Sequence, residues 1–171
     1  ATMYSMSGEI PKPLGNSHFV HVPYNTFKTK SDLIVLALVG DNFWPDLVDI
    51  IDDKALRAPH FKEGPARLAE KELIEARITS VLTQRDADYW LERLEQAKIP
   101  CARVNNMAQA MRDPQVLARN MIVDIAHPIE GSAKAPGNPI KLSDTNGDSY
   151  SPPPLLGADN QEVFREWLGD D

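Results

Sequence analysis

The distribution of proline most constrains what this chain can fold into. The 171 residues include 14 prolines, more than the average content of about 5%. Proline breaks helices and cannot donate a hydrogen bond inside a sheet, so proline-rich stretches favour extended segments and loops. Many lie towards the two ends, at Pro11, Pro13, Pro23, Pro136, Pro139, Pro152, Pro153 and Pro154. We therefore expect a mixed α/β fold of α+β character: a small domain with a hairpin and helices, followed by an extended tail.

Two neighbouring strands are predicted near the start of the chain. Residues 21–29 and 33–39 are rich in β-branched and apolar side chains, and the turn Lys30-Ser31-Asp32 separates them, which predicts a hairpin. Residues 33–39 are apolar at almost every position, a pattern typical of a strand buried on both faces.

Helical periodicity dominates the middle of the chain. Asp41 or Asn42 is expected to cap a helix over residues 43–51, and a polar loop is expected over 52–65. A long helix over 66–82 is predicted from the spacing of Leu68, Ile74, Ile78, Val81 and Leu82. The next helix begins after Asp86, has a core stripe of Trp90, Leu91 and Leu94, and is expected to end at Pro100.

Short elements and a long loop are predicted for the last third. Asn105 or Asn106 begins a brief helix, Asp113-Pro114 begins another, and residues 121–126 and 132–135 form a second hairpin around residues 127–131. A final helix is predicted over 160–168. Residues 136–157 have no periodicity, and loops of that length are usually functional or pack on another body.

Charge and cysteine content restrict the partners and the compartment. The formal net charge is −7, and an acidic surface repels phosphate backbones and anionic lipid, so neither a nucleic-acid partner nor a membrane partner is expected. Cys101 is the single cysteine, so no disulfide forms within the chain, which is typical of a reducing compartment. No apolar run is long enough to span a bilayer, and a cytoplasmic location is expected. The chain begins without methionine and is expected to be a segment of a longer protein.

The sequence has few motifs that indicate a catalytic or ligand-binding site. The sequence has neither a GxGxxG nor a GxxxxGK[ST] motif, and one cysteine with four histidines does not predict a zinc site, so no cofactor and no metal are expected. His18 and His21 are three residues apart, a spacing that would place their rings on opposite faces of an extended segment. Asp46, Asp49 and Asp53 have helical spacing and are expected to form one solvated face, and Cys101 is expected to be a buried structural thiol. From the residues alone, the chain has no self-contained active site.

Several strings nevertheless occur in the order typical of one family. They are GNSHFVHVPYNTFKT at 15–29, LIVLAL at 33–38, PHFKEGPAR at 59–67, DADYWLERLEQAKIPCARVN at 86–105, DPQVLARNM at 113–121, GNPIKLS at 137–143 and PPLLG at 153–157. Taken together, the chain resembles the C-terminal part of a family III CoA-transferase, the CaiB/BaiF or formyl-CoA transferase type. Each string is weakly specific, but their common order makes the resemblance specific.

The resemblance implies a domain organisation. Residues 1–14 would be a lead-in linker, residues 15–105 the small domain, and residues 106–171 a segment that returns to a Rossmann-like large domain. Members of the family are longer chains that form interlocked homodimers, so a homodimer is expected for the parent protein.

The resemblance also implies a reaction, with coenzyme A as a substrate. In the family, an aspartate attacks an acyl-CoA thioester, and an aspartyl-CoA intermediate then passes CoA to a free carboxylic acid. That aspartate belongs to the family's N-terminal half, and no aspartate here matches its motif, so we assign no catalytic residue. The glycine-rich loop of some members would fall near Gly15 but is absent or replaced here. Residues in the region where the family's small domain approaches the active site are candidates for substrate binding: Asn16, Ser17, His18 and Tyr24.

Two alternatives remain open. The parent protein could be an α-methylacyl-CoA racemase, which shares the fold but moves a proton. The chain could also be a non-catalytic assembly module that complements a separate subunit, since it is acidic and has a strap-like tail.

Overall fold

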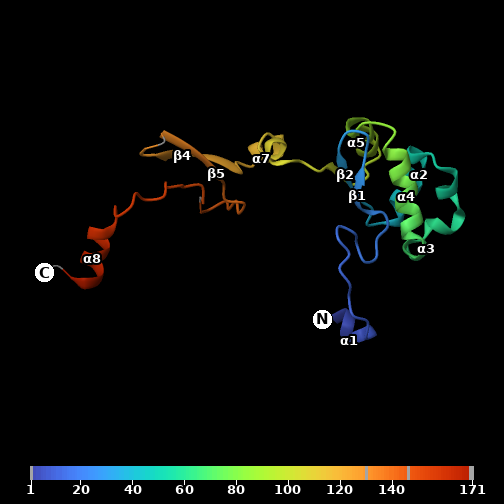
Figure 1. The fold of residues 1–171 in the computed structure, drawn as a ribbon, viewed down its shortest axis with the longest axis horizontal. Coiled ribbons are helices and arrows are strands. Elements are labelled where there is room, and N and C mark those ends of the chain that lie inside the picture. The colour runs from blue at the N-terminus through green and yellow to red at the C-terminus, as the bar shows by residue number, and fades with distance from the viewer. Residues whose placement is uncertain (1, 130, 146, 170–171) are drawn as a thin grey trace. The chain divides into compact units, whose positions relative to one another are not determined.

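The computed structural model describes residues 2–129, 131–145 and 147–169, coloured by position in Figure 1. The described chain divides into two compact units, Ala1–Val104 and Asn105–Asp171, and each is described by itself. Glu130, part of the second predicted turn, and Asn146, in the long loop, lie outside the described residues.

A three-stranded antiparallel sheet organises the first unit. Strand β1 (Tyr24–Lys28) pairs with β2 (Leu33–Ala37), and β2 pairs with β3 (Cys101–Arg103), in the order β1-β2-β3. The hairpin prediction is confirmed, although both strands are shorter than expected. Buried Thr29 closes the turn, because its hydroxyl donates to the carbonyl of Asp32 and accepts from the backbone N–H of Asp32.

Within the first unit, the helices cover one face of β2. Ile34 and Leu36 are fully buried, whereas Leu33 at one end is 45% exposed and Val39, just beyond the other end, is 58% exposed. The prediction that residues 33–39 are buried on both faces is therefore wrong for this chain by itself. Alternate residues of a strand point to opposite faces, and the helices pack on the face that carries Ile34 and Leu36.

The helices of the first unit differ from the predictions in three places. Residues 2–7, expected to be irregular, form a short helix, and the expected loop over 52–65 contains two 3-10 helices with buried Leu56 and Phe61. The expected single helix over 66–82 is two helices that meet at Glu70, whose φ of −116° and ψ of 31° are not helical. The elements are α1 (Thr2–Ser7), η1 (Asp41–Phe43), α2 (Trp44–Ile51), η2 (Lys54–Arg57), η3 (Pro59–Lys62), α3 (Gly64–Ala69), α4 (Lys71–Leu82) and α5 (Ala87–Gln96).

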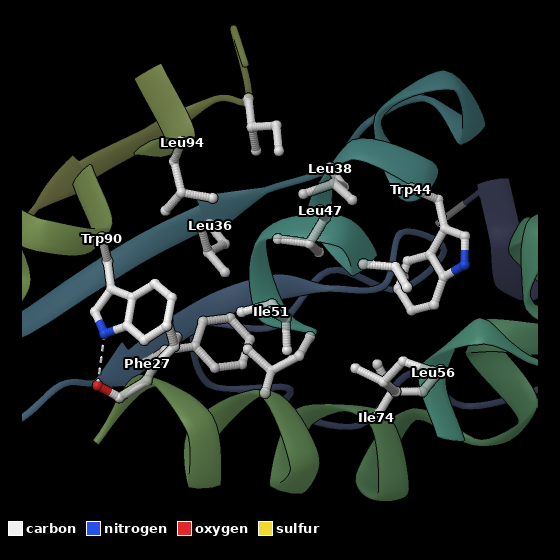
Figure 2. Close-up of a cluster of buried hydrophobic side chains, with 14 of the residues drawn as sticks. Phe27, Leu36, Leu38, Trp44, Leu47, Ile51, Leu56, Ile74, Trp90 and Leu94 are labelled. Atoms are coloured by element: carbon white, nitrogen blue, oxygen red, sulfur yellow. Dashed lines mark hydrogen bonds between the residues drawn. The ribbon is translucent and has the colours of Figure 1, made fainter. Parts of the chain in front are cut away.

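The core lies between the sheet and helices α2, α4 and α5. Figure 2 shows side chains from β1, β2 and these helices meeting in one apolar cluster. Trp90 is 5% exposed, and its indole Nε1 donates to the carbonyl of Leu82 at 2.8 Å, so the polar end of the buried ring has a partner. Ile74, Ile78 and Leu82 of α4 are buried as predicted, but Leu68, also expected in that stripe, is 37% exposed.

The second unit is made of short elements. They are α6 (Met107–Ala110), α7 (Pro114–Ala118), the antiparallel pair β4 (Ile122–His127) and β5 (Gly131–Pro136), and α8 (Asn160–Leu168). The second hairpin and the last helix are confirmed, and the predicted caps are present at α6 and α7. Asn106 makes a capping box with Gln109, and the carboxylate of Asp113 accepts from the backbone N–H groups of Gln115 and Val116.

Little apolar surface is buried in the described part of this second unit. Val123 is its buried hydrophobic side chain, at 6% exposure, whereas all residues of α8 are exposed. Trp167 and Leu168 of α8 are 82% and 77% exposed. A two-stranded hairpin is marginally stable by itself in water, so this unit has little to stabilise it internally.

Membrane insertion by a helix is not supported by the described residues, none of which form an apolar helix long enough to cross a bilayer.

Candidate functional site

The loop that precedes β1 brings the predicted binding residues together. Asn16 Nδ2 donates to the hydroxyl of Thr26 at 3.1 Å, while Ser17 Oγ accepts from Asn25 Nδ2 at 2.9 Å. Asn25 and Thr26 are neighbours in β1, so their side chains point to opposite faces of the sheet. Because the loop bonds to both, it crosses the free edge of β1. The backbone N–H of His18 then donates to the carbonyl of Tyr24 at 3.3 Å. We call residues 14–21 the edge loop.

Asn25 joins the edge loop to helix α4. Its amide nitrogen donates both to Ser17 Oγ and to Oε2 of Glu75, each at 2.9 Å, and its amide oxygen accepts from the backbone N–H of Thr26. The other carboxylate oxygen, Oε1 of Glu75, is buried without a hydrogen bond among the described residues. The position of Ser17 thus depends on a side chain 58 residues further along the chain, which no local sequence pattern predicts.

The imidazole of His18 is held by the turn that it helps to form. Its Nδ1 accepts from the backbone N–H groups of Val20 and His21, at 3.0 and 3.1 Å. The ring stacks on Phe19 and His21, with centroids 4.4 and 4.6 Å apart, and lies 5.1 Å from the ring of Tyr24. Histidine 18 is half-buried, and these contacts fix both its position and its orientation.

The prediction that His18 and His21 point to opposite faces is wrong. Residues 18–21 form a turn rather than an extended segment, because His18 Nδ1 draws two consecutive backbone N–H groups towards itself, and the two rings therefore stack. In the described residues no group of three or more histidine, cysteine, aspartate or glutamate side chains could hold a metal ion.

A pocket of about 350 Å³ lies next to the edge loop. Val20 and His21 form part of its wall, Val39 and Leu68 add apolar surface, and Asp41 adds a carboxylate. This composition, mostly apolar with a few polar groups, is typical of small-molecule pockets.

Arg67 supports this pocket from within the protein. Its side chain is 3% exposed, and its guanidinium donates to the carbonyls of Val22, Phe61 and Lys62 and to the carboxylate of Asp41. The Arg67 hydrogen bond lowers the pKa of Asp41 below its ordinary value. Asp41 therefore pairs with Arg67 and does not cap α2, whose N-terminus has no side-chain cap.

Asp46 and Asp49 are exposed on α2, but Asp53 lies beyond that helix and its side chain is 15% exposed, so the prediction of one solvated face is wrong for Asp53. Asp49 binds Arg57, and Asp53 binds Arg77 and accepts from the backbone N–H of Ala55. Burial opposes ionisation of Asp53, but these hydrogen bonds leave its pKa lowered. Both carboxylates are consequently engaged in ion pairs.

Cys101 is expected to react slowly as a nucleophile. Cys101 is half-buried rather than buried as predicted, but this partial burial still raises the pKa of its thiol, and the negative charge of Glu95 raises it further. The thiolate is the reactive form, so at pH 8 the folded chain should be alkylated by iodoacetamide several-fold more slowly than the chain in urea. Mass spectrometry of timed samples measures both rates. Equal rates in the two states would contradict this assignment of Cys101 as a structural thiol.

No sequence pattern identifies Asn25, Glu75 or Arg67 as parts of this region. Their roles depend on contacts between segments far apart in the sequence. The apolar spacing that predicts helices does not predict that the side chain of Arg67 in α3 is buried. The roles of Asn16, Ser17, His18 and Tyr24 in substrate binding remain predictions.

Comparison with known proteins gives the relationship of the whole chain. Residues 1–160 match the profile described as CoA-transferase family III. The chain is 30% identical over 164 residues to succinyl-CoA:mesaconate CoA-transferase of Haloarcula marismortui, covering 95% of this chain and 41% of that protein. It is 29% identical over 174 residues to human succinyl-CoA:glutarate CoA-transferase, covering 98% of this chain and 39% of that protein. The chain therefore spans about two fifths of the length of these curated relatives.

A solved structure gives the same relationship. The crystal structure of a CAIB/BAIF family protein from Brucella suis matches with a TM-score of 0.75 and 26% identity, over 96% of this chain and 43% of that chain.

Proposed function

Because the chain belongs to CoA-transferase family III, we propose that the protein containing it transfers CoA between an acyl-CoA and a free carboxylic acid. The match over residues 1–160 carries this proposal. The edge loop would contribute Asn16, Ser17 and His18 to the substrate site, and β1 would contribute Tyr24. The CoA-transferase names of the two relatives favour transfer over racemisation.

The reaction would proceed through an aspartyl-CoA intermediate on an aspartate that lies outside these 171 residues. No aspartate of this chain matches the nucleophile motif of the family that the sequence resembles, and many of the described aspartates are held by cations. Those in ion pairs are Asp32, Asp41, Asp49, Asp52, Asp53, Asp88, Asp124 and Asp148. Attack by a carboxylate divides one difficult exchange into easier steps, which is the advantage of covalent catalysis.

Exposed apolar surface supports the proposal that the second unit docks on a larger body. In α8, Val163, Phe164, Trp167 and Leu168 are between 45% and 82% exposed. Ile140, Leu142 and Leu156 in the long loop are also exposed. Large exposed apolar patches commonly mark interaction sites. The proposed body is the family's large domain within a homodimer, and the proposed location is the cytoplasm.

A transfer assay tests the proposed function. The full-length polypeptide should pass CoA from succinyl-CoA or acetyl-CoA to a member of a panel that includes oxalate, glutarate and mesaconate. The 171-residue chain should transfer none and should show no micromolar CoA binding by calorimetry. The control for racemisation is exchange of the α-proton of a 2-methylacyl-CoA in deuterated water. Exchange without CoA transfer would overturn the proposal in favour of a racemase.

A further inference from the structure

The two hydrogen bonds to His18 Nδ1 determine which ring nitrogen carries the proton. Both are donated by backbone N–H groups, those of Val20 and His21, so Nδ1 has to be the unprotonated nitrogen. In the neutral ring, the proton is then on Nε2. Stacking on Phe19 and His21 prevents the ring from turning freely, so the Nε2–H bond has a fixed direction.

This Nε2–H group is available to a ligand. It makes no hydrogen bond within the described residues, and it is not among their buried side-chain atoms that lack a partner. The nitrogen is therefore accessible, although the ring as a whole is half-buried. A donor that is fixed in direction and still free is already organised for an incoming acceptor.

We infer that His18 donates a hydrogen bond from Nε2 to the reacting carbonyl oxygen of the acyl-CoA, an inference that rests on the proposed function. When a carboxylate attacks a thioester, negative charge develops on that oxygen. A neutral donor already in place stabilises the charge without losing its proton. The proton remains on Nε2 throughout, so His18 acts neither as a base nor as a nucleophile.

Two substitutions of His18 separate the donor role of Nε2 from the acceptor role of Nδ1 in the turn. In His18→Asn, the amide oxygen can replace Nδ1 as the acceptor for Val20 and His21, but the donor at Nε2 is lost. In His18→Gln, the amide nitrogen reaches the place of Nε2, and the local acceptor is lost. His60→Asn is the matched control, because His60 is an exposed histidine that pairs with Glu70 on the surface.

The measurement is kcat/KM for acyl-CoA in the full-length polypeptide, with the melting temperature as the control for folding. His18→Asn should keep the melting temperature and lose about 10²-fold in kcat/KM, mainly through kcat, as for other oxyanion donors. His18→Gln should recover part of that loss, and His60→Asn should match the wild type.

Three results would overturn the inference. Wild-type activity in His18→Asn would overturn the inference and leave the proposed function intact. A wild type that transfers no CoA would overturn both. Long-range proton–nitrogen NMR of the 171-residue chain gives an independent readout, since a proton on Nδ1 of His18 in the neutral ring would also overturn the inference.

Discussion

Replacing Arg67 with alanine is expected to lower the free energy of unfolding of the first unit by about 3–5 kcal/mol, because three backbone carbonyls would lose their donor, each at a cost of about 1–3 kcal/mol. The guanidinium donates to three backbone carbonyls and one carboxylate and lies 5.0 Å from the ring centroid of Trp44. The variant would leave those carbonyls without their donor and a cavity beside Trp44. Urea denaturation followed by tryptophan fluorescence measures the change.

Asp41→Asn is the matched variant for the other end of this ion pair. Asp41 is 58% exposed and Arg67 would keep its three carbonyl acceptors, so the expected loss is smaller, on the order of 1–2 kcal/mol. Because Arg67 lowers the pKa of Asp41 in the folded state, this contribution is present at neutral pH. It is lost as the pH falls below about 4, through the unfolded and then the folded pKa. Equal losses for the two variants would contradict the assignment of the carbonyls as the main partners of Arg67.

Replacing Trp90 with alanine is expected to have a similarly large effect, about 3–5 kcal/mol, as for other buried aromatic residues. The ring fills the space between α5 and the sheet, and its loss would also leave the carbonyl of Leu82 without its donor (Figure 2). Far-UV circular dichroism during urea denaturation measures the change, since the substitution removes one of the three tryptophans on which fluorescence depends.

Trp167→Ala is the control for this substitution. Trp167 is the same residue type but 82% exposed on α8, so its replacement should change the stability of this chain by less than about 0.5 kcal/mol. Comparable destabilisation by the two substitutions would show that the buried cluster of the first unit is not the main source of its stability.

Patterns that act over a few residues predicted much of the fold. The apolar run after Lys30-Ser31-Asp32 predicted β2, and Asp113-Pro114 predicted α7, because strand propensity and helix capping depend on close neighbours. The final helix was predicted with the bounds that the structure shows, Asn160–Leu168.

The errors arose where distant contacts decide the structure. The region over 52–65 looked like a polar loop, yet Leu56 and Phe61 anchor it in the core through two 3-10 helices. The carboxylate of Asp41 was expected to cap α2 but binds Arg67, a residue 26 positions further along the chain. Such pairings depend on the tertiary fold, so the spacing of nearby residues in the sequence does not predict them.

In the candidate site, too, the sequence predicted the candidate residues but not the distant contacts that position them. The resemblance to the family implied that Asn16, Ser17, His18 and Tyr24 are candidates for substrate binding, and the structure places them in and beside one loop. No sequence pattern predicts the interactions that fix this geometry. They are the hydrogen bond from Asn25 to Glu75 and the acceptor role of His18 Nδ1. The sequence likewise predicted α8 but not that none of its side chains is buried.

Intact mass spectrometry tests the central claim most directly. The full-length polypeptide and the 171-residue chain would each be incubated with an acyl-CoA, quenched and weighed, and the modified residue located by peptide mapping. The account predicts a covalent CoA adduct on one aspartate of the full-length polypeptide, outside the residues described here, and none on the 171-residue chain. An adduct on the 171-residue chain, or CoA transfer by the full-length polypeptide without any adduct, would contradict it.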